Sequence, residues 1–213
     1  MKKTLKDKAY DIIKKKIISC KYKPNEFLSE IELMNEIEVG RTPIREALNK
    51  LEQEHLVKII PKKGSLVSGI AYRDVKEIYE IRELIEPYLI RKYAHKVDKD
   101  KLLKLKDEFE KQRNSKSFDS EEMYVKDDYF HEIIFENSEN KYFINLFNSI
   151  NNQNQRIRVL SGEVDKNRMK ETYDEHIEII NEILEDNIDE AAKIMEHHLK
   201  MGKEAGLKLF IEN

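Results

Sequence analysis

Residues 29–68, SEIELMNEIEVGRTPIREALNKLEQEHLVKIIPKKGSLVS, contain the signals that decide the fold. Ser29 is expected to begin a helix, because Glu32 follows three residues later and the two side chains can form a capping box. After a tight turn that contains a glycine, a second helix is expected with Thr42 as its N-cap and Pro43 at its first position, where a missing N–H costs nothing. Two helices joined in this way predict a helix-turn-helix.

The same stretch ends in two runs rich in β-branched residues, 56–60 and 65–68, on either side of a Pro-Lys-Lys-Gly turn. Runs of this kind predict a β-hairpin. Lys62 and Lys63 would lie at its tip, where they can reach a phosphate or a minor groove. An amphipathic helix is predicted near the N-terminus from the helical spacing of Leu5 and the apolar residues that follow it. Together these elements predict a winged helix-turn-helix.

Four cationic side chains are expected on the DNA-facing elements of such a domain. Arg41 stands just before the second helix of the motif, and Arg45 lies in its first turn, away from the core. The N-terminal end of that helix is the part that enters a major groove, and the paired donors of an arginine suit a guanine edge. With Lys62 and Lys63 at the hairpin tip, this pattern favours DNA binding over the alternative, a winged helix that binds another protein.

The distribution of charge divides the chain near residue 70. Residues 1–70 contain 15 Lys and Arg against 10 Asp and Glu, whereas the remainder contains 24 against 32, so the net charge of −3 joins a basic unit to an acidic one. Such asymmetry points to nucleic acid at the basic end, with ordinary scatter in composition as the alternative. We therefore expect a DNA-binding domain in residues 1–70 and a second domain in residues 71–213.

Composition limits the remaining possibilities. The 213 residues include only four Pro and six Gly, which argues against a sandwich, barrel or propeller and favours long helices. The single cysteine, Cys20, excludes an intramolecular disulfide, and no apolar run is long enough for a signal peptide or a membrane span. These features predict a mainly α-helical, cytoplasmic protein with no membrane partner.

The second domain is predicted to be an all-α helical bundle. Its first helix should cover residues 72–95 and bury Leu84 and Tyr88 among other apolar residues, with Arg82 one residue from that stripe. The spacing of apolar residues predicts further helices after it. They should cover residues 99–113, 120–137, 140–160, 167–185 and 188–209.

Four polar residues fall on the apolar, inward faces of these helices. Asp127 and His131 are four residues apart, which places a carboxylate beside an imidazole, and His176 and His198 align with the apolar residues of the last two helices. Histidines that are hydrogen-bonded in a core are the alternative, but each would need its own polar partner. Three imidazoles and a carboxylate are good ligands for zinc, nickel, manganese or iron, so the spacing favours a metal site.

The segment that begins FLSEIEL and contains RTPIREAL, followed by the PKKGSLV hairpin, resembles the DNA-binding domain of the GntR family of bacterial transcription regulators. Family members usually carry Ser or Thr where Gly40 stands and Arg where Ile31 stands, both as DNA contacts. The operator sequence or the affinity is therefore expected to differ from the family norm. The resemblance implies that these residues contact DNA: Arg41, Thr42, Arg45 and Gly64.

The segments DDYFHEII, EHIEIINEI and AAKIMEHHL, which begin at residues 127, 175 and 191, resemble the FCD effector domain that follows the winged helix in one large GntR subfamily. The resemblance implies a divalent metal ion, with zinc or nickel favoured, and a small carboxylate effector beside it. An arginine commonly pairs with the effector; Arg82 is the first candidate and Arg156 the second, with an ordinary ion pair as the alternative for both. The implied metal ligands are Asp127, His131, His176 and His198.

These observations lead to one principal hypothesis and two alternatives. The principal hypothesis is a homodimeric transcription regulator that reads a pseudo-palindromic operator in double-stranded DNA and responds to a small carboxylate. The first alternative is a metal-dependent, hydrolase-like enzyme that uses the three-histidine, one-aspartate site. Against it, no general base is evident, because Glu175 is expected to project at a different angle from His176. The second alternative is a purely structural metal with no effector.

Overall fold

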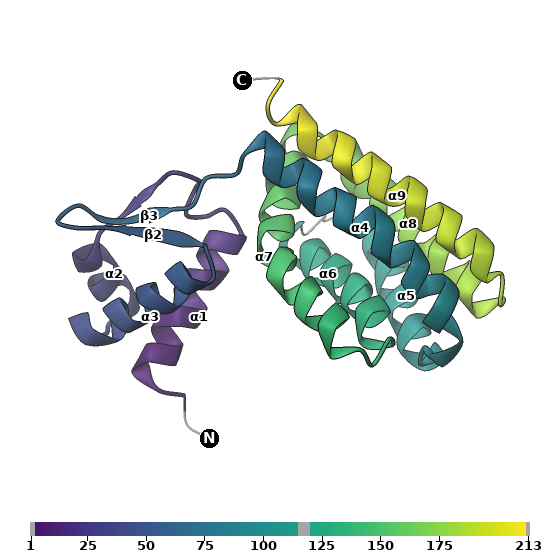
Figure 1. Cartoon of the computed structure of the whole chain (residues 1–213), viewed down its shortest axis with the longest axis horizontal. Helices are drawn as coiled ribbons and strands as arrows, with labels where there is room; N and C mark the ends of the chain where they lie inside the picture. Colours follow the sequence, from purple (N-terminus) through teal and green to yellow (C-terminus); the bar gives the residue numbers. More distant parts are fainter. Residues whose placement is uncertain (1–2, 115–119, 212–213) are drawn as a thin grey trace. The chain divides into compact units, whose positions relative to one another are not determined.

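The computed structural model describes residues 3–114 and 120–211. The chain divides into two compact units, Met1–Ala71 and Tyr72–Asn213, one residue away from the boundary expected from the sequence. The fold is mainly α-helical, as predicted, with a single small sheet in the described residues (Figure 1). Within the same residues, no helix has the length and apolar character that a membrane span requires.

The N-terminal unit is a three-helix domain with a β-hairpin. Helices α1 (Leu5–Ile18), α2 (Glu30–Ile37) and α3 (Arg41–Gln53) are followed by strands β2 (Val57–Ile60) and β3 (Gly64–Val67). Apolar side chains from all three helices form one core with the hairpin, so the predicted winged helix-turn-helix is the observed fold. Its fully buried members include Ala9, Ile13, Ile17, Ile44, Ala47 and Leu51.

A third strand completes the sheet and was not predicted. Strand β1 (Phe27–Leu28) pairs with β3, and the strand order is β1-β3-β2 with antiparallel pairing. Phe27 pairs with Leu66 of β3 in this register. A two-residue strand has no alternating pattern of its own, so only its pairing with a distant strand reveals it.

The helix caps of the helix-turn-helix differ from the prediction. Ser29 precedes α2 but makes no side-chain capping hydrogen bond, and the acidic residues in the first turn of that helix favour its N-terminus instead. Helix α3 begins at Arg41 with Gly40 as its N-cap, so Thr42 and Pro43 lie inside the first turn. Pro43 is still tolerated there, because the first four N–H groups of a helix have no acceptor within the helix.

The C-terminal unit is the predicted bundle of helices. Helix α4 packs along α9, α9 packs along α8, and α5 packs against α8 (Figure 1). The observed ends lie within a few residues of the predicted ones, and the largest difference is the longer C-terminal end of α7. The helices are α4 (Tyr72–Tyr93), α5 (Lys99–Arg113), α6 (Ser120–Glu136), α7 (Lys141–Val164), α8 (Lys166–Leu184) and α9 (Ile188–Lys208), with a short 3-10 turn at Ala94–Lys96.

The buried face of α4 is rotated from the predicted one. Leu84, which was expected in the core, is 71% exposed, and Tyr88 is also exposed. Arg82 and Glu86 lie on the buried face instead, together with Val75, Ile78 and Leu89. The cause is pairing between charged groups, since Arg82 and Glu86 form a buried ion pair one helical turn apart. This rotation brings two charged side chains into the centre of the bundle.

Candidate functional site

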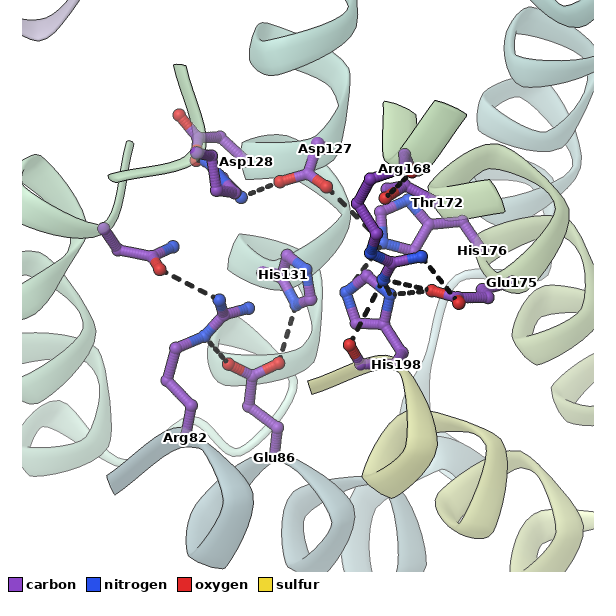
Figure 2. Close-up of polar contacts among 12 residues, drawn as sticks. Arg82, Glu86, Asp127, Asp128, His131, Arg168, Thr172, Glu175, His176 and His198 are labelled. Carbon is purple, nitrogen blue, oxygen red and sulfur yellow. Dashed lines mark hydrogen bonds and ion pairs between the residues drawn. The ribbon is translucent and has the colours of Figure 1, made fainter. Parts of the chain in front are cut away.

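The four predicted metal ligands meet in the C-terminal unit. Asp127 and His131 come from α6, His176 from α8 and His198 from α9, and all four are buried. One possible ligand atom from each residue lies within 4.8 Å of every other. Figure 2 shows the imidazole rings turned toward one another and toward the carboxylate of Asp127. Residues from three helices therefore form one compact polar cluster inside an otherwise apolar core.

Two carboxylates orient two of the imidazole rings. The Nδ1 atom of His131 lies 2.6 Å from Oε2 of Glu86, and Nδ1 of His198 lies 2.6 Å from Oε2 of Glu175. A carboxylate on Nδ1 fixes the tautomer and leaves Nε2 as the free ligand atom, an arrangement common around protein-bound metals. The Nε2 atom of His131 is buried and has no hydrogen-bond partner, as expected for an atom that faces a metal position.

The distances between donor atoms fit a divalent transition metal. The Nε2 atoms of His176 and His198 are 3.4 Å apart, and Nε2 of His176 is 3.6 Å from Oδ1 of Asp127. Two nitrogen ligands about 2.0–2.1 Å from a tetrahedral zinc ion are separated by about 3.3 Å. The set of three nitrogens and one oxygen also suits the other ions named above. The residues present therefore fit the metal that the sequence pattern implies.

The pKa values of the cluster favour metal binding at neutral pH. Burial lowers the pKa of His198 to about 4 and the pKa of His176 well below its ordinary value, so both rings are neutral and able to act as ligands. Burial alone would raise the pKa of Glu175, but hydrogen bonds from His198 and Arg168 outweigh it and hold that pKa at about 2. The imidazoles of His176 and His198 are thus neutral and Glu175 stays ionised, whereas burial raises the pKa of Asp127.

A pocket beside the cluster is lined by three arginines from three helices. Arg82 of α4, Arg158 of α7 and Arg168 of α8 line it together with Asp127 and His198. Their side chains are largely withdrawn from solvent. Three guanidinium groups in one partly enclosed pocket offer several N–H donors, which suit the oxygen atoms of an anionic ligand.

Each of these arginines already has an acidic or amide partner. Arg82 donates from Nε to Glu86 over 2.6 Å and from Nη1 to Asn154 over 3.0 Å, while its buried Nη2 has no hydrogen-bond partner. Arg168 forms two parallel bonds to Glu175, 2.7 and 2.6 Å long. Arg158 pairs with two carboxylates on α6, those of Asp127 and Asp128. Nε of Arg158 and Nε of Arg168 are likewise buried without a hydrogen-bond partner, so each of the three arginines keeps a donor that a ligand could use.

Arg156, the second effector candidate from the sequence, lies elsewhere. Its side chain is fully buried, its Nη1 donates to Gln153 over 2.7 Å, and it is not among the residues that line the pocket. Sequence reasoning missed Arg158 and Arg168, which do line it. Arg156 and Arg158 differ by about 200° around α7, so two positions in sequence separate opposite faces of the helix. Arg158 lies one helical turn after Asn154, the residue that accepts a hydrogen bond from Arg82.

A second concave surface lies on the N-terminal unit, between the start of α2, helix α3 and the hairpin. Arg41, Arg45, Lys62, Lys63 and Gly64 all line it, so the structure brings together five of the six predicted DNA contacts. Thr42 is exposed in the first turn of α3 but does not line this groove. We call this surface, which is lined by Arg41, Arg45, Lys62, Lys63 and Gly64, the basic groove.

The two arginines of the basic groove share one carboxylate. Arg45 donates from Nε to both carboxylate oxygens of Glu30, over 2.9 and 3.1 Å, and Nε of Arg41 lies 3.7 Å from Glu30. Both arginine side chains remain more than half exposed. Glu30 was not predicted as part of the site, because only the fold brings the start of α2 beside α3.

The backbone of the hairpin explains Gly64. Its φ is +113°, a conformation that other residues rarely adopt, and a Cβ atom there would lie 3.0 Å from the carbonyl oxygen of Leu28. Gly64 is therefore required by the turn and by its close approach to β1, independently of any DNA contact. Lys62 at the hairpin tip also has a positive φ, of 64°.

Comparison with known proteins finds relatives of both units. The profile of the bacterial regulatory proteins of the gntR family matches residues 5–67, and that of the FCD domain matches residues 77–201. The uncharacterized HTH-type transcriptional regulator YdhC of Bacillus subtilis (strain 168) is 31% identical over 187 residues, which cover 86% of this chain and 82% of that protein.

Two solved structures share the fold. A GntR transcriptional regulator from Rhodococcus sp. RHA1 has a TM-score of 0.80 at 18% identity, with 96% of this chain and 98% of that one covered. The metal-free FCD domain of TM0439 has a TM-score of 0.61 at 22% identity, with 68% of this chain and 100% of that one covered. At these identities the two structures support the fold alone.

The matched families and the curated relative are transcription regulators, which argues against the hydrolase-like alternative. The profiles together span the helix-turn-helix with its hairpin and most of the bundle with the histidine cluster. The chain therefore belongs to the GntR family of bacterial DNA-binding transcription regulators, among the members that carry an FCD domain.

Proposed function

We propose that the protein controls transcription as a homodimer on a pseudo-palindromic operator, and that a small carboxylate bound beside a divalent metal ion sets its operator affinity. Family membership provides DNA binding. The observation that carries the remainder is the convergence of three imidazoles and a carboxylate beside three largely buried arginines. We further expect the protein to act in the cytoplasm, where its DNA is.

The metal part of the proposal rests on the donor atoms and their support. The nitrogen-rich set favours zinc or nickel, and the hydrogen bonds that Glu86 and Glu175 accept from His131 and His198 orient these two imidazoles. When bound, the ion supplies a fixed positive charge in a site of low solvent access, which strengthens the attraction of an anion. The residues that would hold it are Asp127, His131, His176 and His198.

The effector part of the proposal rests on the arginines of the pocket. Nη2 of Arg82 is a buried donor without a partner, which is costly unless a ligand accepts from it. Burial and the positive charge of Arg82 lower the pKa of Arg158, which indicates that an added negative charge there would be stabilised. A carboxylate placed between these two groups would satisfy both.

A route for communication follows from the position of Arg82. It lies on α4, the helix that begins at the first residue of the C-terminal unit, directly after the DNA-binding unit in the chain. An effector that accepts a hydrogen bond from Arg82 would change the contacts that Arg82 makes with Glu86 and Asn154. For this to change operator affinity, the effector must bind one conformation of the dimer more tightly than another.

The DNA-binding part assigns roles within the basic groove. Arg41 and Arg45, at the N-terminal end of α3, would read base edges in a major groove. Lys62 and Lys63 at the hairpin tip would contact phosphates or the minor groove. Thr42 and Gly64 complete the predicted contacts through the exposed start of α3 and the backbone of the hairpin.

The test uses the full-length protein and duplex DNA from the region upstream of its gene. The protein is stripped with a chelator, reloaded with zinc or nickel, and titrated with DNA in the presence of acetate, citrate and other small carboxylates. A carboxylate that changes DNA affinity in loaded but not in stripped protein supports the proposal. If no carboxylate changes the affinity while the chelator lowers the melting temperature, the metal is structural only.

A pair of variants on α4 makes this test specific to the pocket. Arg82→Gln should abolish the response to the carboxylate. Arg91→Gln removes an exposed arginine of the same helix, whose partner is Glu196, and should leave the response intact. Equal responses in both variants would exclude Arg82 from the effector site.

A further inference from the structure

Among the large aliphatic side chains that line the basic groove, Ile31 is the one that is exposed. Ile31, in the first turn of α2, is 60% exposed, the highest value among the large apolar side chains of the N-terminal unit in the described residues. It lines the same groove as Arg41, Arg45 and Lys63. Contact with an apolar group of a ligand in this groove would remove the isoleucine from water, which is favourable.

The neighbours of Ile31 indicate which part of the DNA would supply an apolar group. The preceding residue, Glu30, is ion-paired with both arginines at the start of α3. Ile31 therefore stands beside the groups that are placed to read base edges, rather than at the hairpin, where phosphate contacts are expected. A phosphate offers an isoleucine no favourable contact, because the side chain can neither donate nor accept a hydrogen bond.

Base edges in a major groove offer one prominent apolar group. Adenine, guanine and cytosine present hydrogen-bond donors and acceptors there, whereas thymine adds its C5 methyl group, which aliphatic side chains contact directly. Burying this methyl against Ile31 removes apolar surface of both partners from water.

We propose that Ile31 contacts the C5 methyl of a thymine in each half-site, so that the protein selects thymine at one defined operator position. This inference rests on the proposed DNA-binding role of the basic groove. It adds an apolar determinant to the guanine readout that the arginines supply. Ile31 is thus a specificity-determining residue for this chain.

The experiment uses the full-length protein and an operator that it selects itself from random duplex DNA. Each thymine of the half-site is replaced in turn by deoxyuridine, symmetrically in both halves, which removes the methyl group and keeps base pairing. Replacement at one position should weaken wild-type binding about fourfold per half-site, the factor that corresponds to burying one methyl group. Replacement at the other positions should have smaller effects.

Three variants assign the methyl contact to the side chain. Ile31→Ala should bind the thymine and deoxyuridine duplexes equally at that position, and Ile31→Val should keep most of the difference. Leu5→Ala is the matched control, because Leu5 is 58% exposed on α1 and does not line the groove. It should keep the full wild-type difference. Both positions, Ile31 and Leu5, are exposed, so the three variants should fold, which circular dichroism checks.

The outcomes separate this inference from the proposal beneath it. If wild-type protein selects an operator but no deoxyuridine replacement weakens binding, or if Ile31→Ala keeps the wild-type difference, the methyl contact is wrong and the basic groove can still bind DNA. If Arg45→Ala leaves operator binding unchanged, the assignment of the groove fails and the methyl contact fails with it.

Discussion

Two of the arginine–glutamate pairings in the protein form under opposite conditions. In the basic groove, Arg41 and Arg45 share Glu30 while more than half of each arginine side chain stays exposed. In the bundle, Arg82 pairs with Glu86 where both side chains are almost completely buried. An exposed pair is weak and exchanges readily for phosphates or bases, whereas a buried pair is costly to break because one charge stays behind. The same chemistry therefore serves exchange in one unit and fixed geometry in the other.

The largest expected effect comes from breaking the buried pair. Glu86→Ala leaves Arg82 buried without its partner and frees Nδ1 of His131, so it should lower the free energy of unfolding by about 3–5 kcal/mol. Metal affinity should fall by about tenfold to a hundredfold. Urea denaturation measures the free energy of unfolding, and zinc titration measures the metal affinity. In the same assay Glu30→Ala should leave the stability nearly unchanged; equal losses would refute the contrast between the two pairs.

Removal of the metal should affect only the unit with the buried cluster. A ligand at about a hundred times its dissociation constant stabilises the folded state by about 2.7 kcal/mol, so a chelator should lower the melting temperature of the bundle on the order of 10 °C. In His131→Ala the chelator should have little effect, because a ligand is lost. Differential scanning calorimetry follows both transitions. A chelator that shifts the N-terminal transition equally would place the metal elsewhere.

Substitutions in the basic groove should change DNA binding and spare stability. Arg45→Ala should weaken operator binding about tenfold or more and relax the preference for one base. Lys62→Ala should weaken binding to all sequences more evenly and reduce the slope of affinity against salt by about one ion. Fluorescence anisotropy at several salt concentrations distinguishes the two. If Lys62→Ala alters base preference instead, the hairpin reads sequence rather than phosphate.

The smallest expected effect is release of the exposed arginines from their shared carboxylate. Glu30→Gln removes a negative charge from the basic groove, so affinity for random duplex DNA should rise by a factor of about two to five. Affinity for the operator should rise less, so the ratio of operator affinity to random-DNA affinity should fall. Glu46→Gln, on an exposed position of α3 outside the groove, is the control. A rise of the same size in the control would mean that net charge, not the Glu30 contact, sets the affinity.

Local patterns predicted most of the elements and also predicted that the four candidate ligands lie together. The i, i+4 spacing of Asp127 and His131, and the alignment of His176 and His198 with apolar neighbours, were sufficient to place four residues in one cluster. Helical periodicity works here because each ligand lies on a face that is otherwise apolar. The helix-turn-helix and its hairpin were predictable for the same reason, since the turn residues and the apolar periods agree.

Charged residues that are buried by partners from other helices were not predictable in this way. Glu86 and Glu175 read as solvent-facing in sequence, yet each accepts a bond from a histidine of another helix. Arg158 is recognisable only once α6 is seen beside α7, where two carboxylates meet it. A hydrophobicity pattern assigns such residues to the surface, because it records the cost of burying a charge and not the partner that offsets that cost.

The spacing of Arg82 and Glu86 on one turn of α4 has an evolutionary consequence. Arg82 faces the pocket and Glu86 orients a histidine of the cluster, and the two side chains hold each other. A lineage that alters the first residue therefore disturbs the second, so a new effector preference requires compensating changes around the histidines. A substitution at Ile31 requires no compensating change, because its side chain is exposed and does not pack in the core. Descendants of this protein should acquire new operators more readily than new signals.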